Sequence, residues 1–384
     1  MTDQPVLTVT PTDRRRRTRS SIYHYLYTAP SPRSKQQIAN DLNLSLPTVY
    51  QNLSELLEAG LIDYTGAQRS SGGRPAQQLS VIPDARLSVG ISITVHRLRF
   101  ILTDLKCNQR GFKDVRHTHE LKEDGYDVFL AEELERFLDE QQVDRSRLLG
   151  VGITIAAMLS PDGQEILFAP TLGMYHVPLS RLLNKIPYKV YPENDGTSGG
   201  FGEWFSSPSD TSIAFLSLED GVGGAVLVNN APFTGCNNRS GEFGHMCVEP
   251  GGLACACGNS GCLEAYCSAM RLSDRLGITL REFFAGVDAG NTQYRALLDD
   301  YLMHLAIGIH NIRMVLNCDI VIGGFMSTFL EPYMPYLRRF LKEYDRFDAD
   351  SSYLRLSRHG KYAALMGCAF YFVKDFLDEI KTSG

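Results

Sequence analysis

Hydrophobic positions in the first 80 residues recur at the spacing of short amphipathic helices. The pattern predicts helices over 13–28, 35–42 and 46–59. Ser34 and Ser45 stand where N-caps of the second and third helix are expected. Two short helices joined by a tight turn, the second one longer, are typical of a helix-turn-helix.

Two apolar runs follow and predict a β-hairpin. Leu61–Tyr64 and Gln77–Val81 are the expected strands, and the stretch between them contains Gly72-Gly73-Arg74-Pro75. A glycine-rich tip that bears arginines is typical of the wing of a winged helix, which enters a DNA groove. The alternative is a helical hairpin and ribbon that contact another protein.

The N-terminal part of the third helix supplies the side chains expected to reach a DNA groove. Leu46 and Asn52 share this face with the candidates. The residues predicted to contact DNA are Ser45, Thr48, Tyr50, Gln51, Arg69 and Arg74.

In the body, polar or glycine-rich segments come directly after apolar strands. Glu193-Asn194-Asp195 follows the strand expected at 188–191, and glycine-rich stretches occupy 220–225 and 323–324. Ligands of open α/β sheets bind at the carboxyl ends of strands, and carboxylates with an amide suit sugar hydroxyls. Glu242 and Glu264 belong to the same set of candidates. Each of these side chains has the alternative role of a helix cap or surface residue.

One segment has the residues and spacing of a metal site. His245, Cys255, Cys257 and Cys262 fall within 18 residues, with glycines between the last two cysteines. Three thiolates and an imidazole with no open position favour structural Zn²⁺ over magnesium or calcium. The alternative is a set of buried cysteines with no ion.

Charge is distributed unevenly along the chain. The 384 residues have a net charge of −6, but residues 1–80, which include the run Arg14–Arg17, contain nine Lys/Arg and six Asp/Glu. A basic head on an acidic body favours nucleic-acid contact by the head. Without an apolar stretch long enough to cross a bilayer or a signal-type segment, we expect a cytoplasmic protein that does not contact a membrane.

Residues 12 to about 380 resemble the ROK family, which groups sugar-responsive repressors with sugar kinases. The most specific match is Gly244-His245 followed by the cysteine segment 255–264, together with 193–195 and 321–324. The winged head resembles the repressor branch. The resemblance implies an α/β protein: a winged helix-turn-helix at 1–80, then a two-lobed actin-like (ribonuclease H-like) sugar-kinase fold. Its lobes would span 85–195, completed by the C-terminal helix 367–384, and 196–366 with the zinc site.

The resemblance also implies roles for individual residues. Asn194, Asp195, Glu242, His245 and Glu264 would contact the hydroxyls of a sugar between the lobes. Asp195 would be the general base in a kinase.

Three residues depart from the kinase pattern. The family's kinases have Asp-x-Gly-Gly-Thr after the first strand, whereas this chain has Ser92, Thr94 and Val95 in place of the aspartate and the two glycines. Phosphoryl transfer depends on positioning and charge neutralisation, so we expect no catalytic residues and no kinase activity. Glu219-Asp220 adds negative charge where a nucleotide phosphate would lie.

These features predict a transcriptional regulator of carbohydrate genes, a repressor controlled by a sugar or sugar phosphate, which binds operator DNA as a homodimer or a dimer of dimers. The first alternative is an ATP-dependent ROK sugar kinase with a DNA-binding extension. The second is a regulator controlled by a protein partner.

Overall fold

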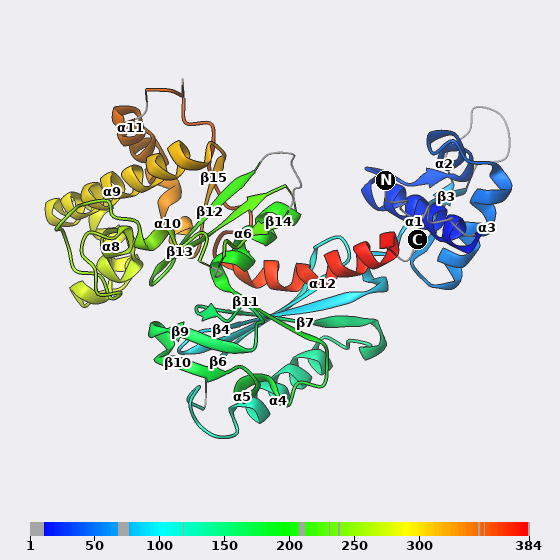
Figure 1. Ribbon diagram of the computed structural model, residues 1–384, viewed down its shortest axis with the longest axis horizontal. Coiled ribbons are helices and arrows are strands. Elements are labelled where there is room, and N and C mark those ends of the chain that lie inside the picture. Colours follow the sequence, from blue (N-terminus) through cyan, green and yellow to red (C-terminus); the bar gives the residue numbers. More distant parts are fainter. Residues whose placement is uncertain are drawn as a thin grey trace, which may run out of the picture.

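The computed structural model of the chain places a small N-terminal head beside a larger α/β body (Figure 1). No helix in the described part combines the length and apolar character that a membrane crossing needs. The structure describes residues 11–67, 77–117, 119–206, 212–229, 231–236, 239–344, 346–348 and 350–382.

The head is built as the sequence pattern predicts. The Ser34 hydroxyl accepts a hydrogen bond from the backbone N–H of Gln37, and the Gln37 side-chain oxygen accepts one from the backbone N–H of Ser34, so a capping box starts the second helix. Ser45 accepts from the backbone N–H of Thr48 and starts the third. A three-stranded sheet in the order β1-β3-β2 completes the head. Its elements are α1 (Pro11–Thr28), β1 (Arg33–Ser34), α2 (Lys35–Asp41), α3 (Leu46–Glu58), β2 (Ile62–Ala67) and β3 (Gln77–Val81).

The first lobe of the body is a five-stranded sheet in the order β11-β7-β4-β5-β6. Strands β4, β5 and β6 form an antiparallel meander, and β7 and β11 add parallel strands beside β4. Helix α4 covers one face of this sheet, and a small sheet β10-β9-β8 follows β7. The elements are β4 (Leu87–Ile93), β5 (Arg97–Asp104), β6 (Gln109–Arg116), α4 (Tyr126–Glu140), β7 (Leu148–Ile155), β8 (Met158–Leu159), β9 (Glu165–Ala169), β10 (Met174–Pro178), α5 (Ser180–Leu183) and β11 (Val190–Asn194).

The second lobe repeats this topology. Its sheet has the order β14-β13-β12-β15-β16, again an antiparallel meander followed by two parallel strands. Alternate residues of β12 face opposite sides: Leu216 joins a core with α9, and Phe215 joins a core with α6 and α12. The elements are β12 (Ile213–Leu218), β13 (Val222–Val228), β14 (Ala231–Phe233), α7 (Leu263–Cys267), α8 (Leu280–Asp288), α9 (Thr292–Leu316), β15 (Asp319–Gly323), α10 (Ser327–Leu330), α11 (Met334–Tyr344) and β16 (Leu354–Leu356).

Two helices connect the lobes. Helix α6 (Asp195–Phe205) begins at the end of β11 and packs on the second sheet. Helix α12 (Ala363–Thr382) packs on the first sheet and on α6, and then continues to the head (Figure 1). The predicted domain limits at 80–85, 195–196 and 366–367 stay a prediction.

The core of the head includes residues from the body. Ile22 and Leu26 of α1 share one buried cluster with Leu105, Val373 and Leu377. The contact between the head and the body is therefore an apolar interface to which α12 contributes a full face.

Candidate functional site

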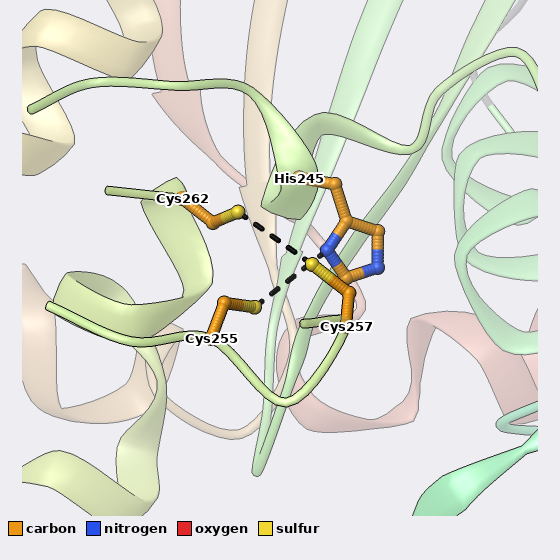
Figure 2. A group of neighbouring side chains, drawn as sticks. All are labelled: His245, Cys255, Cys257 and Cys262. Carbon is orange, nitrogen blue, oxygen red and sulfur yellow. Dashed lines mark hydrogen bonds between the residues drawn. The ribbon is translucent and has the colours of Figure 1, made fainter. Parts of the chain in front are cut away.

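The four residues predicted to bind a metal converge in the second lobe (Figure 2). His245 ends a 3₁₀ turn, Cys255 and Cys257 lie in the following loop, and Cys262 precedes the first turn of α7. One donor atom from each of the four lies within 4.8 Å of the others. The sequence prediction of a metal-binding cluster is thus confirmed at the level of geometry.

The spacing of these donor atoms fits a tetrahedral ion. Cys257 Sγ lies 3.7 Å from Cys262 Sγ, and Cys255 Sγ lies 3.9 Å from His245 Nδ1 (Figure 2). Two sulfurs bound at about 2.3 Å to one tetrahedral zinc would lie about 3.8 Å apart. The set therefore fits Zn²⁺ with His245 bound through Nδ1.

The loop backbone is shaped to hold the cysteines together. Gly261 has a φ of +79°, and a Cβ there would lie 1.9 Å from the carbonyl oxygen of Glu249.

The backbone N–H of Asn259 lowers the pKa of Cys257, whereas burial raises the pKa of Cys262 to about 12. A cation among these groups would favour the thiolates, so metal binding would release protons.

Two predicted sugar-binding residues occupy the junction of β11 and α6. Asn194 is the last residue of the strand and caps the helix: its Oδ1 accepts from the backbone N–H of Thr197 at 3.1 Å, and its Nδ2 donates to Ala157 O at 3.0 Å. Asp195 is the first residue of the helix, and burial raises its pKa to about 6, with a further contribution from the charge of Glu242. The alternative role as a helix cap is thus realised at Asn194.

The acidic residues beside the cysteine cluster are joined to it. Glu264 accepts from the backbone N–H of Val222 at 3.0 Å and from Cys255 Sγ at 3.7 Å. Burial raises the pKa of Glu242, whereas the charge of His245 lowers it. The charges of His245 and Glu264 therefore both act on Glu242, and the charge of Glu242 in turn acts on Asp195.

A cavity of about 470 Å³ lies beside these groups. Of the five predicted sugar-binding residues, Asn194 and Glu242 line it, and Asp195, His245 and Glu264 do not. Sequence reasoning missed Asp162, Tyr191 and Phe233, which also line it. No local signal marks them, because they reach the cavity from three separate elements.

The segment predicted to depart from the kinase phosphate loop is a tight turn between β4 and β5. The backbone N–H of Thr94 donates to Arg97 O at 3.1 Å, and the Thr94 hydroxyl donates to the same oxygen at 3.0 Å. Neither Thr94 nor Val95 has a positive φ. Thus Ser92 at the end of β4 leads into a closed turn that offers no left-handed glycine backbone.

An acidic pair lies in the turn between β12 and β13. Burial raises the pKa of Glu219 well above its usual range, and the charges of Asp195 and Asp220 raise it further, while Arg99 lowers it. Burial raises the pKa of Asp220 as well, so both carboxyl groups are favoured in their neutral form, and the predicted repulsion of a nucleotide phosphate by this pair stays a prediction.

In the head, the third helix presents most of its predicted residues to solvent. Ser45, Tyr50 and Gln51 are exposed, and Thr48 is half-buried. Asn52 instead points inward, is 1% exposed, and donates to Thr48 O at 2.8 Å, so its expected place on the groove face is wrong. Arg69 and Arg74 lie outside the described residues.

Part of the basic run is engaged within the head. Arg19 forms a 2.7 Å ion pair with Glu55 of α3, and Arg15 pairs with the same carboxylate. Arg16 and Arg17 are exposed on α1. The positive charge available to a polyanion is therefore smaller than the sequence count indicates.

The head is also fixed to the body by polar and aromatic contacts. Tyr27 Oη donates to Leu105 O at 2.7 Å, and Lys106 Nζ donates to Tyr27 O. The rings of Tyr23 and Phe376 meet edge to face with centroids 6.4 Å apart. A shift of α12 would consequently act on α1 directly.

Comparison with known proteins gives two family matches: a model described as the ROK family covers residues 88–375, and one described as a helix-turn-helix domain covers 16–65. The xylose repressor of Bacillus spizizenii is 26% identical over 367 residues, which are 91% of this chain and 94% of that protein. A solved ROK family transcriptional regulator, a homologue of the E. coli MLC protein, has a TM-score of 0.76 at 21% identity over 96% of this chain and 97% of its own. The ROK hexokinase of Thermus thermophilus has a TM-score of 0.63 at 25% identity over 75% of this chain and 99% of its own. The expected fold, an α/β body of the sugar-kinase type behind a helix-turn-helix, is confirmed.

Proposed function

The chain belongs to the ROK family, and from this premise we propose that it is a transcriptional repressor of carbohydrate genes whose binding to operator DNA is controlled by a sugar or a sugar phosphate. The observation that carries the proposal is the helix-turn-helix head, whose third helix exposes Tyr50 and Gln51 and whose core is shared with the ROK body. The alignment with the xylose repressor covers nearly the full length of both chains, so it includes the head.

DNA contact is assigned to the N-terminal part of α3 and to the wing. Ser45, Thr48, Tyr50 and Gln51 would read base edges or hold phosphates, and Arg69 and Arg74 would enter the neighbouring groove. Two heads of a homodimer, or four of a dimer of dimers, would bind operator half-sites of matching spacing. The protein would act in the cytoplasm.

The effector would bind between the lobes. Asn194, Asp195, Glu242, His245 and Glu264 supply amide, carboxylate and imidazole groups for sugar hydroxyls. Structural Zn²⁺ held by His245, Cys255, Cys257 and Cys262 would fix the loop that orients these groups. Zinc would supply no reaction here, since all four of its positions would be occupied by the protein.

The route from effector to head would run through two helices. Asp195 opens α6, α6 packs against α12, and α12 reaches the core of the head through Val373 and Leu377. A sugar that prefers one arrangement of the lobes would bias the placement of the heads by its differential affinity, on a scale of about 1–3 kcal/mol.

The test selects an operator from random duplex DNA with the wild-type protein and then measures binding of variants to it. Gln51→Ala and Thr48→Ala should each weaken binding by about 1–3 kcal/mol for a lost base contact and relax base preference nearby. Gln293→Ala, which changes an exposed glutamine on α9, is the matched control. Wild-type affinity in both head variants, or no sequence selected at all, would refute the proposed use of the head.

The second candidate is an ATP-dependent sugar kinase with a DNA-binding extension. It is favoured by Asp195 at the start of α6 and by the likeness of the body to a ROK hexokinase. It is opposed by the closed turn at Thr94. Control by a protein partner in place of a sugar is a third hypothesis, which a pull-down with wild-type protein would test.

A further inference from the structure

The cavity beside the predicted sugar-binding residues is formed where two sheets end. Its walls come from β11, the edge strand of the first sheet, from β14, the edge strand of the second, and from the turn between β8 and β9. Its volume of about 470 Å³ lies within the range of small-molecule sites. A ligand here would touch both lobes.

This cavity continues the predicted sugar site without coinciding with it. Asn194 and Glu242 belong to both, whereas Asp195 and Glu264 lie outside the lining. A sugar ring held by Asp195 and Glu264 would therefore leave the cavity open for a further group attached to that ring.

Two aromatic side chains make the cavity suited to a second ring. Tyr191 on β11 is 40% exposed, and Phe233 on β14 is 56% exposed. Aromatic faces pack well on the apolar faces of ring-shaped ligands, and their partial exposure leaves surface for such contact. The ring of Tyr191 is braced by Tyr371, with centroids 4.6 Å apart, so it is held in place before a ligand arrives.

The charges of the lining disfavour an anionic ligand. Asp162, Glu193 and Glu242 face the cavity, and no Lys, Arg or His is among the described residues that line it. Arg239 is exposed outside the lining, and its charge lowers the pKa of Glu242. Burial raises the pKa of Glu193 and Glu242, whereas hydrogen bonds from Ser160 and Gln164 lower the pKa of Asp162, so Asp162 is the most fully charged carboxylate of the lining. A phosphate dianion would meet like charges and few donors, whereas hydroxyl groups could donate to the carboxylates.

We infer that the effector is an uncharged glycoside of at least two rings, with one ring at the Asp195–Glu264 group and the second between Tyr191 and Phe233. This inference rests on the proposed function. The proposed function leaves open whether the effector is a neutral sugar or a sugar phosphate, and this inference chooses the neutral sugar.

The test measures binding of matched probes to full-length protein by calorimetry: glucose, cellobiose and glucose 6-phosphate, and xylose, xylobiose and xylose 5-phosphate. In at least one series the disaccharide should bind about tenfold more tightly than its monosaccharide, and the phosphate more weakly than both. Phe233→Ala should reduce the ratio of the two neutral affinities to about one, and Phe233→Tyr should keep it. Phe168→Ala, an exposed aromatic on β9 outside the cavity, should also keep the ratio.

The outcomes separate this inference from the proposed function. A monosaccharide or a phosphorylated sugar that binds most tightly and changes operator affinity would overturn the two-ring inference and leave the repressor standing. A disaccharide that binds in a Phe233-dependent way with no effect on operator affinity would support the subsite and count against the repressor. Absence of binding by every probe would overturn the inference.

Discussion

Gly202 of α6 and Gly367 of α12 lie against each other where the two helices cross. A Cβ on Gly202 would lie 2.8 Å from the Cα of Gly367, and a Cβ on Gly367 would lie 1.7 Å from the carbonyl oxygen of Ser198. The backbones of the two helices are thus in direct contact, and the crossing has no room for a side chain.

Gly367→Ala should therefore destabilise the protein. The new methyl group must push α12 from α6, at a cost of about 1–3 kcal/mol for overpacking. Urea unfolding measures the loss, with Gly223→Ala as the control because an added Cβ there meets nothing within 4 Å. In the assay of operator release by a binding sugar, Gly367→Ala should also lose response. Unchanged stability and response would show that the crossing tolerates movement.

The metal content of the protein tests the cysteine cluster. Protein purified without chelator should contain about one Zn²⁺ per chain, and Cys257→Ser should lose it, because one thiolate of four is removed. Cys236→Ser is the matched control, since Cys236 is exposed and does not belong to the cluster. Elemental analysis that finds no zinc in wild type, or equal zinc in both variants, would contradict the assignment.

We expect no phosphorylation of sugars by the wild-type protein. This expectation rests on the predicted replacement of the acid and the two glycines of the kinase loop by Ser92, Thr94 and Val95, and on the turn that Thr94 closes through Arg97. A coupled assay of ATP consumption over hexoses, pentoses and amino sugars measures this, with a ROK glucokinase as positive control. Turnover of about one per second that Asp195→Asn abolishes would establish the kinase reading.

The stability of the protein should depend on pH through Asp195. Its pKa is raised to about 6 by burial, so the folded state binds this proton more tightly than the unfolded chain. The contribution of the protonated Asp195 carboxyl to the unfolding free energy is therefore present at low pH and is lost as pH rises from about 4 through about 6. Asp195→Asn should flatten this dependence and raise the unfolding free energy at pH 7.5 by up to about 3 kcal/mol.

Chemical unfolding at pH 4.5, 6 and 7.5 measures the effect. Asp144→Asn is the control of opposite sign, because the hydroxyl and N–H of Ser146 lower the pKa of Asp144. An Asp195→Asn variant less stable than wild type at pH 7.5 with the same slope would show that the carboxylate is stabilised in the fold.

Local features of the sequence predicted the helices, caps and metal cluster well. Ser34 and Ser45 cap the helices they precede, and the His-Cys spacing places four donors together. Such features depend on residues close in the chain, so periodicity and spacing contain the information. Strand β2 runs to Ala67, three residues beyond its predicted end, because pairing with β3 extends it.

Features that depend on distant residues were not predictable in the same way. Asn52 stands at a position of α3 whose burial is decided by packing within the head. Arg15 and Arg19 of α1 form ion pairs with Glu55 of α3, so a count of charges along the sequence overstates the positive charge that is free on the surface. The cavity joins Asp162, Tyr191 and Phe233 from three elements, and only the arrangement of the two sheets brings them together.

The apolar interface between α1 and α12 has a consequence for the synthesis of the protein. The head is translated before the body, and Val373 and Leu377, which complete its core, follow it by about 300 residues. A nascent chain therefore carries a head with an unfilled apolar face until α12 has been translated. Translation that stops before residue 363 would yield a product whose head lacks part of its core, so premature fragments would compete poorly with the finished repressor for operator DNA.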